Sequence, residues 1–293
     1  MFRFAVMSDI HIQFWDAESH RRLHAALEDY AGLPEPPELI IVNGDLTDGR
    51  SEDYETLLSL LADHARLPVW VTMGNHEYYR MWYRKGEHYE WHKSTFPNGW
   101  SSEAAVRQFT RYFNLPKPYY DRWFGPYHFI FLAGEQYQDA NREFGEHAWL
   151  SDEQFEFLND ALRQNDNKHT AGDSAPDKPP VFVFLHQPLE DVVQRERLQD
   201  ILSAHPEVIL FSGHTHYELQ SPGIYRNVGF AHIESSSIRQ PWSPTTKGPI
   251  PGTISESLLV AAKPDRVVIR GRRHDEQRWV DAVHIVRERP WRY

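Results

Sequence analysis

Five short apolar runs in this chain each end in a polar turn, and this recurrence constrains the fold more than any other feature of the sequence. Apolar runs of this length are typical of strands that are buried on both faces. Helix-like stretches separate several of them, which predicts βαβ crossovers and therefore an α/β fold. The five runs are Phe2–Met7, Glu38–Val42, Pro68–Thr72, Pro180–Leu185 and Glu207–Phe211.

The rest of the chain completes this α/β scheme with helices and further strands. We predict helices at Glu18–Tyr30, Glu52–Ala65 and Val192–Ala204. From Tyr217 on, short strands separated by turns suit a second sheet that packs on the first. These strands are Asn227–Ile233, Ser257–Ala261, Arg266–Arg270 and Asp281–Val286.

The segment Tyr78–Pro126 breaks this rhythm with a dense series of aromatic residues before another predicted strand at Tyr127–Leu132. A long excursion directly after a strand end is a common place for substrate-shaping loops. We therefore expect a cap-like insertion, residues 78–126, within a single domain that spans residues 1–293. The alternative is that these aromatics form a satellite core and only a few line the pocket. Asp166–Pro180 is rich in Gly, Pro and Asp and predicts a surface loop.

Composition limits the partners and the kinds of site that the chain can form. It has 293 residues, no cysteine and a net charge of −11. Disulfides and thiolate ligands are thereby excluded, so any metal must be bound by nitrogen and oxygen atoms. An acidic surface disfavours nucleic acid and favours a small substrate. No apolar run could span a membrane and the N-terminus lacks a signal-peptide pattern, so we expect a cytoplasmic location.

Each of the five predicted strand ends carries side chains that bind metals. Two turns contain Asp-x-His or His-x-His, and a spacing of two points both side chains the same way in extended backbone. Two others place Asp or Asn directly after Gly, which permits a sharp turn close to an ion. Singly, each has an ordinary explanation as turn chemistry or a core histidine, but together they would meet at one sheet edge. The candidate ligands are Asp9, His11, Asp45, Asn75, His186, His214 and His216.

In wording and order, these turns resemble those of the calcineurin-like metallophosphoesterases. That family carries Asp-x-His, Gly-Asp-x-x-Asp, Gly-Asn-His-Asp/Glu, a single His and Gly-His-x-His. The resemblance spans residues 9 to 216 and implies the family's β-sandwich, in which two packed sheets are flanked by helices. The matching segments are Asp9-Ile10-His11, Gly44-Asp45-Leu46-Thr47-Asp48, Gly74-Asn75-His76-Glu77, His186 and Gly213-His214-Thr215-His216.

The resemblance also implies two divalent metal ions, with Mn or Fe expected and Zn or Co as alternatives. Asp45 would bridge the ions, because a shared carboxylate reduces their mutual repulsion. A hydroxide that bridges both ions would then be the nucleophile that attacks phosphorus. The other ligands would be Asp9, His11 and His216 for one ion, and Asn75, His186 and His214 for the other.

Three further residues of these motifs have implied roles. His76 would be the catalytic residue that stabilises the phosphoryl group or protonates the leaving oxygen, with a structural histidine as the alternative. Asp48 and Glu77 would orient the histidine ligands from outside the metal site, although Asp48 could also be a solvated turn residue. Purple acid phosphatases carry a tyrosine where this chain has Asp48, so their Fe(III)–tyrosinate site is not expected here.

The wording of the motifs is most similar to that of bacterial class III cyclic-nucleotide phosphodiesterases. The resemblance therefore implies hydrolysis of a small diester such as a cyclic nucleotide. A phosphomonoesterase or nucleotide pyrophosphatase is the alternative, and Arg80, Arg84 and Arg122 are candidates for gripping a terminal phosphate unless they are surface charges. A non-catalytic interaction module on the same fold, as in a retromer subunit, is a third hypothesis, which the complete ligand set disfavours.

Overall fold

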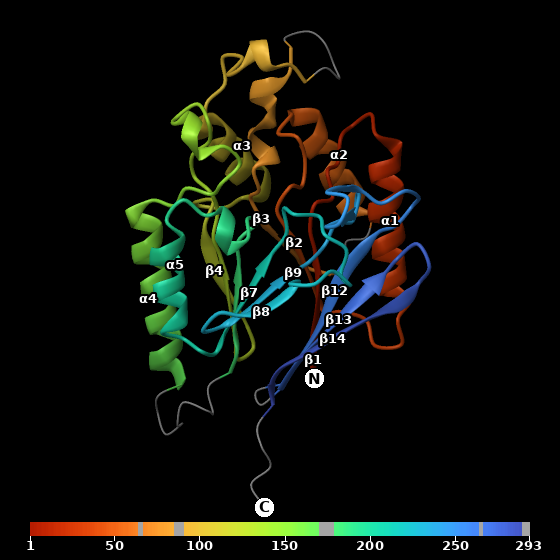
Figure 1. The fold of residues 1–293 in the computed structure, drawn as a ribbon, viewed down its shortest axis with the longest axis vertical. Helices are drawn as coiled ribbons and strands as arrows, with labels where there is room; N and C mark the ends of the chain where they lie inside the picture. Colours follow the sequence, from red (N-terminus) through yellow and green to blue (C-terminus); the bar gives the residue numbers. More distant parts are fainter. Residues whose placement is uncertain (64–66, 85–90, 170–178, 264–265, 289–293) are drawn as a thin grey trace, which may run out of the picture.

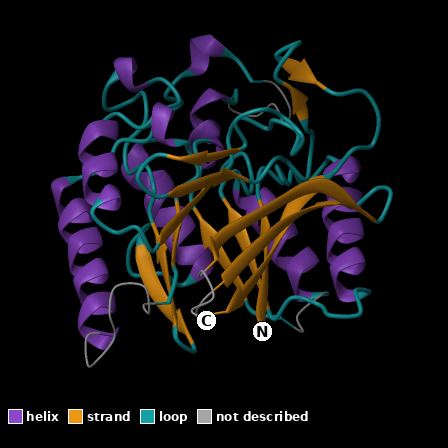
Figure 2. Cartoon of the chain, turned by 60° about the horizontal axis from the view of Figure 1, so that its bottom comes forward, coloured by secondary structure: helices purple, strands orange, loops and turns teal. Residues whose placement is uncertain are grey.

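Two six-stranded β-sheets pack face to face and carry helices on their outer faces (Figure 1). In this computed structural model the described residues are 1–63, 67–84, 91–169, 179–263 and 266–288. Figure 2 shows the strands of both sheets between two groups of helices. The predicted α/β fold with two packed sheets is confirmed. In these ranges, none of the helices has the length and apolar character needed to cross a membrane.

The first sheet combines strands from both ends of the chain. It consists of β1 (Phe2–Met7), β2 (Leu39–Asn43), β3 (Val69–Thr72), β12 (Glu256–Lys263), β13 (Arg266–Arg273) and β14 (Arg278–Glu288). The order is β14-β13-β12-β1-β2-β3, in which β1, β2 and β3 run parallel and β12 joins β1 antiparallel. The parallel strands therefore end at the same edge of the sheet.

The second sheet is built from the middle of the chain. It consists of β4 (Tyr120–Phe124), β5 (Tyr127–Phe131), β6 (Val181–Phe184), β7 (Val208–Ser212), β8 (Tyr225–Asn227) and β9 (Ala231–Glu234). The order is β4-β5-β6-β7-β9-β8, with parallel pairs from β5 to β9. A separate two-stranded ribbon follows, formed by β10 (Trp242–Ser243) and β11 (Gly248–Pro249).

Among the described residues, five α-helices cover the two sheets. The first sheet is covered by α1 (Ala17–Ala31), α2 (Ser51–Ala62) and α3 (Ser102–Phe113), and the second by α4 (Asp152–His169) and α5 (Arg195–Ser203). Short 3₁₀ helices lie at His76–Trp82 (η1), Lys93–Thr95, Arg142–Phe144 and Leu189–Asp191. Alternate side chains of β1 serve two cores: Phe4 and Val6 pack between the sheets, whereas Ala5 and Met7 pack under the helices.

The section after Tyr217 does not complete the second sheet as predicted. Its strands are divided, since β8 and β9 join the second sheet whereas β12, β13 and β14 extend the first. The physical reason is that β1 would otherwise be an edge strand, and β12 has buried residues on both faces to cover it. The predicted strand Asn227–Ile233 is two strands, because Gly229, with φ +97°, turns the chain between them.

Other predicted boundaries shift by a few residues, and several elements were not predicted, among them the ribbon of β10 and β11. The third predicted helix begins at Arg195 rather than Val192, and α2 ends at Ala62, with Ala65 outside the described residues. The elements α3, α4 and β4 carry too many polar residues to stand out in the sequence. The predicted loop Asp166–Pro180 overlaps the end of α4, and residues 170–178 lie outside the described residues.

Candidate metal centre

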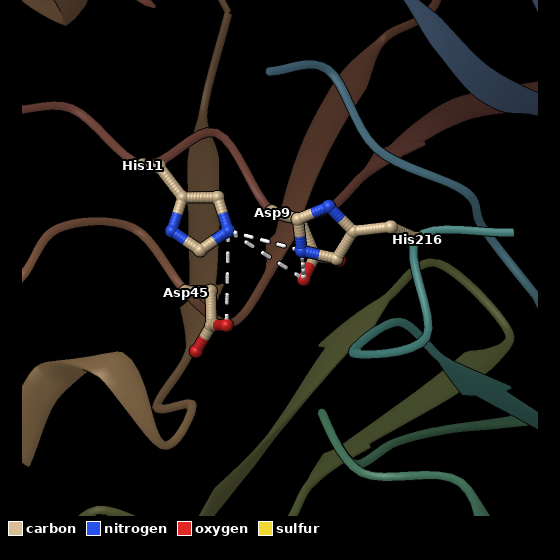
Figure 3. Close-up of side chains that lie close together, drawn as sticks. All are labelled: Asp9, His11, Asp45 and His216. Carbon is tan, nitrogen blue, oxygen red and sulfur yellow. Dashed lines mark hydrogen bonds and ion pairs between the residues drawn. The ribbon is translucent and has the colours of Figure 1, made fainter. Parts of the chain in front are cut away.

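All seven candidate ligands lie just beyond strand ends, but the strands belong to two sheets. The turns after β1, β2 and β3 come from the first sheet, and those after β6 and β7 come from the second. Asn43 at the end of β2 connects them, because its Nδ2 donates to the carbonyl of Phe211 in β7 at 3.2 Å. The two sheet edges thus meet at one place, where Figure 3 shows Asp9, His11, Asp45 and His216 facing one another.

The backbone of the two x-spaced pairs is not extended, contrary to the prediction. Asp9 and His11 have φ angles of +52° and +45°, and His214 and His216 have φ angles of +70° and +58°. Asp45 has a φ of +51°. Non-glycine residues in this left-handed region cost free energy and cluster at functional sites. The pairs therefore point at a common centre through tightly turned backbone rather than through a strand.

The glycines that precede the ligands permit a close approach of neighbouring turns. A Cβ on Gly74 would lie 2.3 Å from Asp45 Oδ1, and one on Gly213 would lie 1.9 Å from Ser8 Oγ. Contacts this short are not tolerated between non-bonded atoms, so any side chain here would push the turns apart. Glycine at these positions is required by packing against Asp45 and Ser8.

A first group of ligand atoms comes from Asp9, His11, Asp45 and His216 (Figure 3). Their ligand atoms all lie within 4.8 Å of one another. His216 Nε2 lies 3.0 Å from Asp9 Oδ1 and 3.1 Å from His11 Nε2. His11 Nε2 lies 3.8 Å from Asp45 Oδ2. These distances are those of atoms that surround a common ion rather than of a packed apolar core.

A second group shares Asp45 with the first. Asp45, His186 and His214 place ligand atoms within 4.8 Å of one another, and His186 Nε2 lies 3.1 Å from Asp45 Oδ2. Asn75 Oδ1 lies 3.0 Å from His214 Nδ1. All seven candidate ligands are therefore brought together, and Asp45 lies in both groups.

The tautomers of two histidines are fixed by backbone carbonyls. His186 Nδ1 donates to the carbonyl of Asn43 at 2.8 Å, and His216 Nδ1 donates to that of Gln240 at 2.9 Å. In the neutral rings, Nε2 then carries a lone pair that points into the centre. The Nε2 of His216 faces Asp9 Oδ1 at 3.0 Å, so a proton or a metal ion must lie between the two atoms.

Two buried atoms of the centre have no hydrogen-bond partner among the described residues. Asp9 Oδ1 and His186 Nε2 are both in this state, although His216 Nε2 lies 3.0 Å from the first and Asp45 Oδ2 lies 3.1 Å from the second. Buried polar atoms are normally paired, and a buried carboxylate without a partner is costly. Divalent cations would satisfy both atoms, so the nitrogen and oxygen donors of these residues fit the two implied ions.

The charges of the centre shift the pKa values of its groups strongly. Burial alone would raise the pKa of Asp9, but His216 and His186 outweigh it and hold that pKa far below its usual range. Burial likewise opposes the ionised form of Asp45, yet His186 and His76 hold its pKa well below the usual range. Burial lowers the pKa of His11 to about 3, with His76 adding to the effect. Both carboxylates are therefore ionised and able to bind cations.

His76 is held beside the centre by Asp48. His76 Nδ1 lies 2.8 Å from Asp48 Oδ1, and its Nε2 lies 3.8 Å from Asp45 Oδ2. The other oxygen of Asp48 binds the side chains of Tyr83 and Gln13. Burial would lower the pKa of His76, but Asp45 and Asp48 raise it to about 9. Asp48 is a buried partner of His76 rather than a solvated turn residue.

Glu77 stabilises the turns rather than a histidine. Its Oε1 accepts the backbone N–H groups of Leu46 and Thr47, each at 2.9 Å, and its Oε2 accepts that of Gly74 at 2.7 Å. It thereby ties the turn after β2 to the turn after β3. Burial, together with the nearby Asp45, raises the pKa of Glu77 to about 7.

A cavity of about 550 Å³ lies over the centre. The lining residues outside the ligand set come mostly from segments that carried no motif. Among the described residues of the predicted insertion, Tyr79 alone lines the cavity, and half of the other aromatics of that segment belong to or pack against the core under α1, α2 and α3. None of Arg80, Arg84 and Arg122 lines this cavity. The lining includes Gln13, Trp15, Asp16, Asp48, His76, Tyr79, Glu146, Arg239, Gln240 and Trp242.

Several of these residues could not have been found from the sequence. Glu146 accepts from Asn75 Nδ2 at 2.8 Å, so it turns the Oδ1 of Asn75 towards His214. Arg239 lies in the cavity wall and pairs with Asp16 at 2.8 Å. Each lies in an irregular segment far along the chain from its partner, with no spacing or glycine signal to mark it.

The sequence profile of one family matches most of the chain. The profile described as calcineurin-like phosphoesterase matches residues 2–218, a range that contains all seven candidate ligands and His76. No curated protein sequence matches the chain.

Two solved structures share the fold over nearly the whole chain. A dimetal phosphatase from zebrafish (Danio rerio) has a TM-score of 0.63 and 14% identity, and the match covers 98% of this chain and 99% of that one. A purple acid phosphatase from yellow lupin (Lupinus luteus) seeds also has a TM-score of 0.63 and 14% identity, and covers 98% of this chain. The chain spans 54% of the lupin protein. At this identity the likeness shows the fold alone.

Proposed function

The chain belongs to the calcineurin-like phosphoesterase family, and from that membership we propose that it hydrolyses small phosphodiesters such as a cyclic nucleotide. It is a metal-dependent phosphoesterase. The residues that surround the cavity over the metal centre support the choice of substrate, the ions and the roles of single residues.

The ions are proposed to be Mn or Fe, held in two groups of ligands. Asp9, His11 and His216 would hold one, Asn75, His186 and His214 the other, and Asp45 would hold both. When bound, divalent ions activate water as a nucleophile and neutralise charge on the phosphoryl oxygens. The protein contributes the fixed ring tautomers and the ionised carboxylates that favour cation binding.

One observation favours a diester over a monoester: outside the candidate ligands, both cationic side chains among the described residues of the cavity wall are already paired with carboxylates. Arg239 pairs with Asp16 and His76 pairs with Asp48, and Glu146 adds a further carboxylate. A terminal phosphate dianion would be repelled by these carboxylates unless both charges lay on the metal ions. A diester carries a single negative charge and meets less repulsion.

His76 is proposed as the group that donates a proton to the leaving oxygen. Its side chain lines the cavity, and Asp48 fixes the ring through Nδ1. Nε2 is then the atom that can reach a substrate bound at the centre. Tyr79 stacks on the ring with centroids 3.8 Å apart, so the orientation is restrained from a second side. Such positioned acids contribute roughly 10²–10⁴-fold to a rate.

A nucleotide pyrophosphatase is the second candidate, and Arg239 is the observation that favours it. A substrate with two linked phosphates could place one at the centre and the other near this guanidinium in the cavity wall. The similarity in wording to class III cyclic-nucleotide phosphodiesterases supports the diester instead. We also propose a single domain over residues 1–293, in which residues 78–126 are a cap-like insertion that contributes Tyr79 to the cavity.

The two candidates are separated by a substrate screen. Mn-loaded protein would be assayed on bis(p-nitrophenyl) phosphate, 3′,5′-cyclic AMP, p-nitrophenyl phosphate and ADP-ribose. We expect a higher kcat/KM on the two diesters than on the monoester. Efficient cleavage of the monoester with no activity on either diester would contradict the proposal, and cleavage of ADP-ribose alone would support the pyrophosphatase.

A further inference from the structure

Two large aromatic side chains are exposed at the mouth of the catalytic cavity. Trp15 and Trp242 line it, with exposed fractions of 45% and 37%. Indole side chains bury 150–250 Å² when fully packed, so each of these two still has surface that a bound ligand could cover. Exposed aromatics that line a cavity over a centre are a feature of ligand sites.

Trp242 is fixed next to the first group of ligands. Its backbone N–H donates to the carbonyl of His216 at 2.7 Å, and the two rings have centroids 5.7 Å apart. Its strand, β10, pairs with β11, which places Pro249 opposite Trp242 and also in the cavity wall. The indole is therefore held at a defined place beside a candidate metal ligand.

Trp15 comes from a different segment, which is tied to the same side of the cavity. Its neighbour Asp16 pairs with Arg239 at 2.8 Å, and Arg239 lies three residues before Trp242. On the other side of Trp15, Gln13 binds Asp48, the partner of His76. Both indoles are thus carried by segments that are anchored to the centre and linked to each other.

The cavity is therefore unequal in its two halves. The part beside His216 has Trp242, and Trp15 is joined to the same segment through the ion pair of Asp16 with Arg239. The part beside Asn75 has Glu146, which binds the Asn75 amide and has no paired cation among the described residues of the wall. A carboxylate next to one half repels anionic groups, while indole faces attract flat π systems. A volume of about 550 Å³ is within the range of small-ligand sites and accommodates a nucleotide-sized group.

We propose that Trp15 and Trp242 bind a flat ring of the substrate, an aryl group or nucleobase linked to the scissile phosphate, in the half of the cavity beside His216. This inference rests on the proposed phosphoesterase site and adds the class of group that the site selects. Both tryptophans lie outside residues 78–126, the segment in which the sequence predicted a cap-like insertion.

The test measures selectivity between matched substrates that do or do not carry a ring. The ratio of kcat/KM for phenyl and ethyl esters would be measured on phosphodiesters and on phosphomonoesters. Stacking on an aromatic side chain changes binding by roughly 5- to 100-fold. We expect the phenyl-to-ethyl ratio to fall by that factor in Trp15→Ala and in Trp242→Ala, and to recover largely in Trp242→Phe.

Trp91→Ala is the matched control. Trp91 is exposed to a similar fraction, 44%, packs on Trp82 and does not line the cavity, so the ratio should stay at the wild-type value. An unchanged ratio in both cavity variants would overturn the proposal, as would an equal fall in the Trp91 variant. Trp15→Phe serves if Trp15→Ala does not fold.

A binding measurement keeps this result separate from the proposed function. Calorimetric titration of adenosine 5′-monophosphate into the metal-loaded protein reports ring binding without turnover, and ribose 5-phosphate is the ring-free comparison. We expect tighter binding of the nucleotide in the wild type, and loss of that advantage in Trp242→Ala. If diesters were not cleaved but the advantage persisted, the diester assignment would fail while the ring site would stand. Equal binding of both ligands to the wild type would overturn the ring site.

Discussion

Two buried clusters of Asp and His in this protein have similar composition and opposite states of hydrogen bonding. At the metal centre, Asp9 Oδ1 and His186 Nε2 have no hydrogen-bond partner among the described residues. In the second cluster, between α1 and the first sheet, Asp29 accepts from Arg272 Nε and from His274 Nδ1, each at 2.8 Å. The other ring nitrogen of this histidine is also paired, because His274 Nε2 lies 2.7 Å from Ser257 Oγ.

The two clusters show how a buried carboxylate that stabilises the fold differs from one that can bind cations. A cluster whose donors and acceptors are all matched inside the protein is complete and stabilises the fold. A cluster in which electron-rich atoms face one another is incomplete, and bound cations would satisfy those atoms. Changes at the centre should therefore lower ion content and turnover, whereas changes at Asp29 should lower the free energy of unfolding.

The largest effect is expected from Asp45→Asn. Asp45 lies in both ligand groups, and the substitution removes the negative charge that both ions would share. We expect ion content to fall from two per chain and kcat/KM to fall by at least about 10³-fold, because the metals supply several kcal/mol of transition-state stabilisation. Elemental analysis and steady-state kinetics measure both quantities.

Asp29→Asn is the control for this change, since Asp29 is also a buried aspartate but lies outside the cavity. It should keep both ions and normal turnover per folded molecule. If Asp45→Asn kept two ions and ordinary activity, the proposed difference in cation binding between the two clusters would be contradicted.

His76→Ala is expected to lower kcat by roughly 10²–10⁴-fold while ion content stays near normal. The reason is that His76 hydrogen-bonds Asp48 beside the centre, and we propose that it donates a proton rather than holding an ion. His128→Gln is the matched control, because His128 pairs with Asp121 at the same distance of 2.8 Å on β5, outside the cavity. Loss of the ions together with activity in His76→Ala would contradict the assigned role.

The clustering of the candidate residues was predictable from the sequence for a physical reason. Asp9, Asp45 and His186 follow buried strands, and the carboxyl ends of parallel strands meet. That local signal did not reveal the left-handed backbone of His11, because φ depends on how the turns after β1 and β2 pack together. The fold class followed from the same strands, whereas the pairing of β12 with β1 did not, since nothing local specifies which free edge a late strand joins.

The second cluster could not be predicted at all. Asp29 and Arg272 are 243 residues apart, and each looks like an ordinary charged residue in its own element. The same holds for Trp242, whose place beside His216 depends on a ribbon of two-residue strands. Contacts that are set by the packing of distant segments leave no periodic pattern in a single sequence.

Asp29→Ala is expected to lower the free energy of unfolding by about 3–5 kcal/mol, because Arg272 would remain buried without its partner. Activity per folded molecule and ion content should stay unchanged. Urea denaturation of the metal-free protein measures the loss. A variant as stable as the wild type would show that the cluster does not stabilise the fold.

The pH dependence of that loss gives an independent check. Burial would raise the pKa of Asp29, but the hydrogen bonds from Arg272 and His274 lower it from 3.8 to about 2. A carboxyl with a lowered pKa stabilises the fold above its unfolded value, and the contribution disappears as the pH falls through the folded value. The gap in stability between wild type and Asp29→Ala should therefore be full above pH 4 and shrink as the pH approaches 2.

The smallest effect is expected from Glu146→Ala, because Glu146 shares a property with each of the two clusters. It accepts from Asn75 Nδ2 at 2.8 Å and from the Tyr137 hydroxyl at 2.7 Å, so its hydrogen bonds are satisfied within the protein and one of them also orients a candidate ligand. Groups that orient metal ligands from outside typically contribute 10- to 100-fold to metal affinity. We expect a weakening of that size for one ion of the two, because Asn75 contacts only the group that contains His214.

Competition with a chelator measures the two affinities separately, and Glu135→Ala is the control. Glu135 also accepts two hydrogen bonds, from Ser151 N and Gln154 Nε2, but does not line the cavity. Equal weakening of both ions in Glu146→Ala would mean that the charge of Glu146, rather than its bond to Asn75, controls affinity. Weakening of one ion alone would show that an internally matched carboxylate can serve the centre by fixing the direction of a neighbouring amide.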